Sequence, residues 1–286
     1  MQKKRKILAV AVGALTLTAS AGTAQAQNAR AQTAPPFVAY HDLTSAQQTE
    51  RFNTLRAQGY RPITVNISTD FSGRIRYAGM WSTSGRAMGG DLPWVMYQDM
   101  SADGYQRRFD QLAAQGYQPA VVSATGYNAT ARFAAIFIKN PGSRFVAKHD
   151  LSPAQLLQMT GTARENGLMP ASVDVYGTAD APRYVAVWVA NPSRARWLVR
   201  TGLTQEDHDF EFKSHVAKGY RPTAIAVSGN NLYTTVWRND NPGAWYSYIG
   251  MTAAGYQSRF TELKAKGFYP ININAERGRY AAIWTK

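Results

Sequence analysis

The residues best suited to chemistry follow five prolines at a fixed spacing, two and four positions into runs rich in Val and Ile. The prolines are Pro62, Pro119, Pro170, Pro222 and Pro270. The polar residues at these positions are Thr64, Asn66, Ser123, Ser172, Asp174, Asn272 and Asn274. Because side chains alternate along a strand, all seven are predicted to share one face. That face would line solvent, the interpretation we favour, or a central cavity where the copies form a shared ligand-binding surface.

Asp174 is the only carboxylate in this polar row. Binding to a repetitive polymer can use several copies, whereas catalysis requires one copy to differ. A hydrolase with a single site built from Asn66, Asp174, Asn274 and a histidine is therefore a second hypothesis. Ser-His-Asp chemistry also stays open, because the partners of a triad need not be close in sequence. We assign no catalytic residue.

Arginine recurs at the start of the last predicted strand in four copies, and the four residues are Arg76, Arg132, Arg183 and Arg279. Each side chain could bind an anionic ligand, lie over the ring of the next residue, or pair with an acid. Because they could bind an anionic ligand, we include these four arginines among the predicted ligand-binding residues.

The four histidines do not define a site. His41 and His149 occupy equivalent positions before an aspartate, but the other copies carry Gln98, Thr201 and Ile249 there. His208 and His215 lie seven residues apart on one predicted helix face and could hold a metal with Asp209 or Glu211. No third ligand follows a known spacing, so a solvated helix face is the favoured interpretation and no metal is predicted. Since the chain has no cysteine and no Gly-rich phosphate loop, we predict no cofactor.

The elements that position these residues repeat five times. Each copy has a Ser or Thr, a glycine fifteen residues later and a proline three residues beyond the glycine, as in Thr44, Gly59 and Pro62. A hydroxyl side chain caps the start of a helix, and glycine takes the left-handed conformation just past its end. The spacing therefore predicts five helices of about three and a half turns. Ser152, Pro153 and Gln155 add a capping-box pattern in the third copy.

A short strand precedes each helix, and two strands separated by a turn follow it. The sequence thus predicts an α/β fold of the α+β repeat type, with one domain over residues 37–286. Its β-α-β-β units span residues 37–84, 94–140, 145–191, 197–240 and 245–286. An open solenoid needs atypical, polar repeats at its two ends. The first and last copies of this chain instead have the same pattern as the middle three. We therefore predict a closed five-bladed ring resembling a propeller, with a pairwise packed array as the alternative.

Ten aromatic residues open or close the units. Those that open them are Phe37, Trp94, Phe145, Trp197 and Trp245, and those that close them are Trp81, Phe137, Trp188, Trp237 and Trp284. Both sets flank apolar strands, so buried packing between the blades is favoured over a platform for sugar stacking.

The first 26 residues have the features of a secretory signal peptide, with Lys3 to Lys6 before an apolar stretch and small residues at Ala24 and Ala26. Residues 27–36 are predicted to form a flexible lead. The protein is therefore expected to be exported to the periplasm or the cell exterior, with no transmembrane span after cleavage. The formal net charge is +14, and removal of the four basic signal residues leaves about +10. Anionic partners such as polysaccharide, peptidoglycan or lipopolysaccharide, or a protein, fit this surplus. Nucleic acid is not expected, because the basic residues are scattered.

The repeated Trp-rich opening, the G-[YF]-x-P centre and the ending RYAAIW resemble a bacterial tandem repeat. The same module is similar to the non-catalytic N-terminal domain that precedes the β-lactamase-like serine hydrolase domain of polyglycine hydrolases. The resemblance covers residues 37–286. It implies a repeat module without hydrolysis, since those enzymes act through a Ser-x-x-Lys motif and no Ser in this chain has Lys three residues later. We therefore expect an exported, non-enzymatic binding module that recognises an envelope or extracellular polymer or protein.

Overall fold

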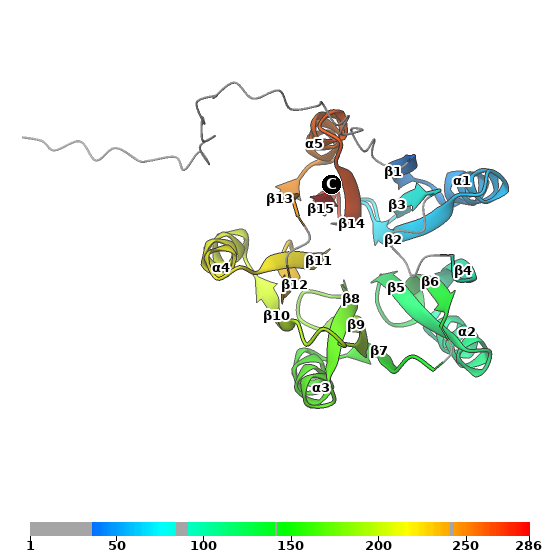
Figure 1. Cartoon of the computed structure of the whole chain (residues 1–286). Coiled ribbons are helices and arrows are strands. Elements are labelled where there is room, and N and C mark those ends of the chain that lie inside the picture. Colours follow the sequence, from blue (N-terminus) through cyan, green and yellow to red (C-terminus); the bar gives the residue numbers. More distant parts are fainter. Residues whose placement is uncertain (1–35, 84–90, 141, 241–242) are drawn as a thin grey trace, which may run out of the picture. The chain divides into compact units, whose positions relative to one another are not determined.

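The computed structural model describes residues 36–83, 91–140, 142–240 and 243–286 (Figure 1). The signal peptide predicted at residues 1–26 and nearly all of the lead predicted at residues 27–36 lie outside the described residues. The described residues contain five units, numbered one to five in chain order, and each has a strand, a helix and two further strands. The predicted five-repeat α+β organisation is confirmed.

Every unit has the same elements at nearly the same lengths. The opening strands are β1 (Phe37–Leu43), β4 (Trp94–Met100), β7 (Phe145–Leu151), β10 (Arg196–Leu203) and β13 (Trp245–Met251). The helices are α1 (Ser45–Ala57), α2 (Ala102–Ala114), α3 (Pro153–Glu165), α4 (Gln205–Ala217) and α5 (Ala253–Ala265). The strands after the prolines, which we call the inner strands, are β2 (Arg61–Thr69), β5 (Tyr117–Thr125), β8 (Leu168–Gly177), β11 (Arg221–Val227) and β14 (Tyr269–Glu276). The closing strands are β3 (Ile75–Ser82), β6 (Arg132–Lys139), β9 (Pro182–Ala190), β12 (Tyr233–Asn239) and β15 (Arg279–Thr285). A short 3₁₀ helix, η1 (Asn128–Thr130), precedes β6. Within the described ranges, no helix has the length and apolar character needed to cross a membrane.

The three strands of each unit form a separate antiparallel sheet, with the closing strand in the middle. One edge is the opening strand and the other is the inner strand. The inner strand therefore presents a free row of N–H groups to whatever lies beside it. Where those N–H groups find acceptors decides how neighbouring units are joined.

The helix boundaries follow the predicted capping residues. In each unit the Ser or Thr side chain accepts a hydrogen bond from the main-chain N–H three residues later, as Thr44 does from Gln47. The capping box predicted at Ser152 and Gln155 is present, and Thr44 and Gln47 form a second one. The glycine beyond each helix has a positive φ, 78° at Gly59, as the left-handed position requires.

The closing aromatics are buried, as the sequence predicts. Trp81 and Trp284 are fully buried, and both lie in the core between the helix and sheet of their own unit. Trp81 also contacts Trp94 of unit two, so the predicted packing between blades is observed for this residue. The closing strand is central in its sheet, so the helix of the same unit covers its side chains as well.

The opening aromatics do pack between units. Trp94 contacts Phe52 and Trp81 of unit one, with ring centroids 6.4 and 5.7 Å apart. Phe37 of unit one contacts Phe260 and Tyr269 of unit five at 6.1 Å. Consecutive inner strands are also neighbours, and β14 of the last unit contacts β2 of the first.

The prediction that His208 and His215 lie on a solvated face is wrong, since both are buried in α4. His208 occupies the position of Tyr256 in α5, and His215 that of Leu263, both of which are core residues. The two imidazoles pack against Trp237, with ring centroids 6.0 and 5.0 Å from it. Burial lowers the pKa of both histidines, so the neutral forms are favoured. The described residues contain no cluster of three potential metal ligands.

Candidate functional site

The residues four positions beyond the prolines join neighbouring inner strands, and we call Asn66, Ser123, Asp174 and Asn274 the polar belt. Each accepts a hydrogen bond from a main-chain N–H that lies five positions beyond the proline of the preceding unit. The donors and distances are Ile67 to Ser123, 3.1 Å; Ala124 to Asp174, 3.0 Å; Val227 to Asn274, 2.8 Å; and Ala275 to Asn66, 3.1 Å. The last bond joins unit five to unit one. The polar belt thus supplies an acceptor for one main-chain N–H at each of four junctions between inner strands.

Asp174 differs from the rest of the polar belt because unit four has Ala226 at the equivalent position, which cannot accept the N–H of Val175. Asp174 Oδ1 accepts that N–H instead, at 2.9 Å, and also accepts the amide of Asn274 at 2.9 Å. Its other oxygen accepts the hydroxyl of Ser123 at 2.6 Å. The carboxylate thereby accepts the N–H of Ala124, as a belt residue of unit three, and also the N–H of Val175, for which unit four has no acceptor. Burial raises the pKa of Asp174 to about 6, although these hydrogen bonds act in the opposite direction.

The residues two positions beyond the prolines form a second, incomplete layer. Ser172 accepts the N–H of Val122 at 3.1 Å, and Asn272 accepts that of Ile225 at 3.1 Å. Together with Thr64, Ser123, Asp174 and Asn274 they line a cavity of about 50 Å³, enough for one or two waters. Our interpretation of this face as solvent-facing is therefore wrong. The inner strands of different units converge on it, which a single strand pattern cannot reveal.

This arrangement bears on the hydrolase hypothesis. Asn66, Asp174 and Asn274 do come together, since Asn274 donates to Asp174 directly and Asn66 is linked to it through Ser123. All three side chains are buried, and no histidine hydrogen bonds to them in the described parts of the chain. Their polar atoms hold the strands together, so the grouping favours a structural role over attack on a substrate. The predicted role of this polar row in ligand binding stays a prediction.

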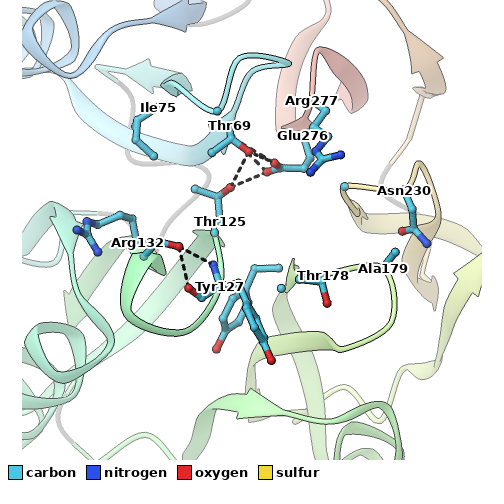
Figure 2. Close-up of a pocket in the computed structure, with 16 residues that line it drawn as sticks. Thr69, Ile75, Thr125, Tyr127, Arg132, Thr178, Ala179, Asn230, Glu276 and Arg277 are labelled. Carbon is cyan, nitrogen blue, oxygen red and sulfur yellow. Dashed lines mark hydrogen bonds between the residues drawn. The ribbon is translucent and has the colours of Figure 1, made fainter.

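A larger cavity opens where the turns after the inner strands converge, and we call it the hairpin pocket. It has a volume of about 600 Å³ and takes residues from every unit, among them Thr69, Thr125, Tyr127, Thr178, Asn230 and Glu276. Figure 2 shows Thr69, Thr125 and Glu276 meeting on one side, with Thr178 and Asn230 across from them. The described turns thus build one concave site from five segments that are far apart in sequence.

Glu276 is the buried carboxyl of the hairpin pocket, with 8% of its surface exposed. Its carboxyl oxygens accept the hydroxyl of Thr125, at 2.8 Å, and the hydroxyl and main-chain N–H of Thr69 (Figure 2). Burial raises the pKa of Glu276 to about 7, against the effect of these hydrogen bonds. No Lys, Arg or His of the described residues lies within ion-pair distance of it.

Glu276 was not predicted from the sequence, because only the positions two and four residues beyond each proline were considered. Glu276 lies six residues beyond Pro270, so it continues the face that carries Asn272 and Asn274. Thr125 and Tyr176 occupy the same position in units two and three, and both also line the hairpin pocket. Extending the polar row by two residues would have identified all three.

The four predicted arginines separate into different environments. Arg76 pairs with Asp42 and Asp70 at 3.2 and 3.0 Å, and Arg183 pairs with Asp150 at 3.1 Å. Arg279 is exposed on β15, opposite Glu276 in the ladder. Of the four, only Arg132 lines the hairpin pocket. The acid-pairing role is thus observed for two of them.

His41, Gln98 and His149 occupy equivalent positions in their units, and each contacts the helix of a neighbouring unit. His41 Nε2 lies 3.1 Å from Gln257 Oε1 on α5, and His149 Nε2 lies 3.0 Å from Gln106 Oε1 on α2. Gln98 donates to Thr49 on α1 at 2.9 Å. The aspartates that follow the two histidines have positive φ angles, 59° at Asp42 and 56° at Asp150, at a bulge of the opening strand. These pairs therefore join units and shape strands.

A family described as polyglycine hydrolase-like, structural repeat, matches the chain five times, at residues 34–84, 91–140, 142–191, 194–240 and 242–286. Each match contains one strand-helix-strand-strand unit of the structure. This chain therefore belongs to the polyglycine hydrolase-like structural repeat family.

Proposed function

We propose that this protein is an exported, non-enzymatic binding module whose ligand, a polymer of the cell envelope or exterior, binds in the hairpin pocket. The observation that carries the proposal is the pocket itself, which combines turns of all five units around one buried carboxyl. Concave sites with a few convergent polar groups are the usual form of ligand sites. The belt residues, in contrast, use their polar atoms in hydrogen bonds to main-chain N–H groups and to one another.

The proposal includes closure of the five units into a ring, because the pocket needs unit five beside unit one. Three contacts support this closure. Asn66 accepts the N–H of Ala275, Phe37 packs on Phe260, and Arg277 N–H donates to the carbonyl of Thr69 at 2.8 Å. The same types of contact join units that are consecutive in sequence.

Closure can be tested by a disulfide, since the chain has no cysteine of its own. The main-chain hydrogen bond from Arg277 to Thr69 brings these two residues together, and a disulfide requires such proximity. The double variant Thr69→Cys with Arg277→Cys should therefore crosslink under mild oxidation and show increased gel mobility. Either single variant serves as the control. An open array would leave the two thiols free.

Binding can be tested with immobilised peptidoglycan, lipopolysaccharide, chitin and polyglycine. The variant Ala179→Trp places a large ring at an exposed position that lines the pocket, and it should weaken binding at least tenfold. Ala114→Trp, at the exposed end of α2, makes the same change away from the pocket and should bind like the wild type. Equal binding by both variants would place the ligand elsewhere, and release of soluble products would contradict a non-enzymatic role.

Export has its own test. Fractionation of cells that express the whole chain should recover it outside the cytoplasm, with Gln27 as the new N-terminus. An unprocessed cytoplasmic chain would contradict export and leave the binding proposal to be judged separately.

A further inference from the structure

We propose that the hairpin pocket recognises a protonated primary amine, held against Glu276, and that the ligand is an amino-sugar oligomer with free amino groups. This inference rests on the proposed binding function and names the chemistry of its ligand. It begins from the charge of the pocket. Glu276 is the single carboxyl that lines it in the described residues, and its partners there are neutral donors from Thr69 and Thr125.

A buried carboxylate without a cation is an unfavourable arrangement. Removing the charge from water costs several kcal/mol, and neutral hydroxyl donors offset this only in part. The raised pKa of Glu276 has the same cause. An ammonium group in the pocket would supply the missing charge and favour the ionised carboxyl. The site is therefore preorganised for a cation that the protein itself does not provide.

The two arginines that line the hairpin pocket do not fill this role. Arg132 donates to the carbonyls of Ala129 and Ala131, at 3.2 and 2.9 Å, and Figure 2 shows its guanidinium directed away from Glu276. The side chain of Arg277 lies over Gly229 in the turn of unit four. Neither arginine forms an ion pair with Glu276 among the described residues. The floor of the pocket thus remains open to a ligand cation.

The remaining pocket groups fit a sugar better than a bare amine. Tyr127 offers a ring on which the face of a pyranose can stack. Thr178 and Asn230 are exposed at the opposite side, and their hydroxyl and amide groups can bond to sugar hydroxyls (Figure 2). A volume of about 600 Å³ admits more than the ammonium alone.

The test compares two ligands that differ only at the nitrogen. Calorimetry at neutral pH should show that hexameric chitosan, with free amines, binds at least tenfold more tightly than the N-acetylated chitin hexamer. Glu276→Gln removes the charge at nearly constant shape and should abolish this preference. Glu262→Gln makes the same change on the surface of α5, where Glu262 pairs with Lys266 at 2.7 Å, and should keep the preference.

Every outcome is informative. Equal affinity of the wild type for the two hexamers would overturn the amine inference, and this comparison does not depend on how a variant folds. Tighter binding of a blocked lysyl peptide than of chitosan would overturn the sugar assignment. Binding of an acetylated or anionic polymer alone would overturn the inference and leave the binding function standing. Failure of all polymers to bind would overturn both.

Discussion

Asp174 on β8 and Glu276 on β14 are two buried carboxyls on the equivalent face of their inner strands, and they have opposite surroundings. Asp174 lies in the polar belt, where four donors from three units surround it. Glu276 lies two residues further along its strand, at the floor of the hairpin pocket, with Thr69 and Thr125 as its partners. Burial raises the pKa of both. The carboxyl of Asp174 accepts hydrogen bonds that hold the units together, whereas that of Glu276 faces a pocket that a ligand can enter.

A raised pKa by itself does not identify a functional site. Structural networks and binding sites both desolvate a carboxyl. A structural network differs from a binding site in two respects: its donors fill all the acceptor positions of the carboxyl, and no cavity large enough for a ligand remains beside the carboxyl. The predictions below test this separation, beginning with the largest expected effect.

Asp174→Ala should destabilise the protein by about 4 kcal/mol, because four buried donors lose their acceptor at about 1 kcal/mol each. Urea denaturation measures this change. Asp180→Ala, on an exposed turn of the same unit, is the control and should leave the free energy of unfolding within about 0.5 kcal/mol of the wild type. A loss below about 1 kcal/mol for Asp174→Ala would remove the distinction between the two carboxyls.

Glu276→Gln should change how stability depends on pH. The pKa of Glu276 is about 7 in the fold and 4.5 as its ordinary value, so between these pH values the native state holds more protons than the unfolded chain. Its contribution to stability therefore falls as pH rises from about 4.5 to about 7, by up to about 3 kcal/mol, and is constant above. The variant should lose this slope and gain most over the wild type near pH 8. Chemical denaturation across pH 5 to 8 measures it, and an unchanged slope would contradict the burial of an unpaired carboxyl.

His208→Tyr with His215→Leu should sharpen the same measurement, since the two histidines contribute a slope of opposite sign. Their pKa values are lowered in the fold, so the unfolded chain takes up protons first when pH falls below about 6.5. Their contribution to stability is complete above that pH and is lost as pH falls further. The double variant copies the residues of α5, and it should raise stability by about 2 kcal/mol at neutral pH because the ring nitrogens of His208 have no hydrogen-bond partners in the described residues. A stability that still falls on acidification below pH 6.5 would place the sensitive groups elsewhere.

Ala226→Ser should show that Asp174 substitutes for the missing acceptor of unit four. In the wild type the change should be nearly neutral, because Val175 N–H already has an acceptor in Asp174. In an Asp174→Asn background it should recover about 1 kcal/mol, since a serine at this position accepts the equivalent N–H in unit two. A double-mutant cycle measures the coupling, and additive effects would mean that the two positions act independently.

The local structure was predictable from particular residues. Thr44, Gly59 and Pro62 mark one helix and the strand after it, and their recurrence at equal spacing predicted all five units. The capping hydroxyls and the positive φ of the glycines follow from chemistry within a few residues of each position. The polar row was also found from sequence, because alternation along a strand is local. Its burial, which we did not favour, and the position of Glu276 were not predicted.

Two features depend on contacts that the sequence order does not reveal. His208 and His215 read as a polar helix face, but the sheet of unit four lies against that face and buries them. Asn66 and Ala275 are 209 residues apart and hydrogen bond because unit five lies beside unit one.

The sequence by itself determined the unit, since capping, turn and alternation signals act over a few residues and recur five times. Only the tertiary structure shows which polar side chains form hydrogen bonds within the fold and which remain free to contact a ligand. The free edge of each inner strand must find acceptors in another unit, and the side chains that supply them become part of the fold. Where the inner strands end, this requirement no longer applies, and Glu276 is left facing the hairpin pocket.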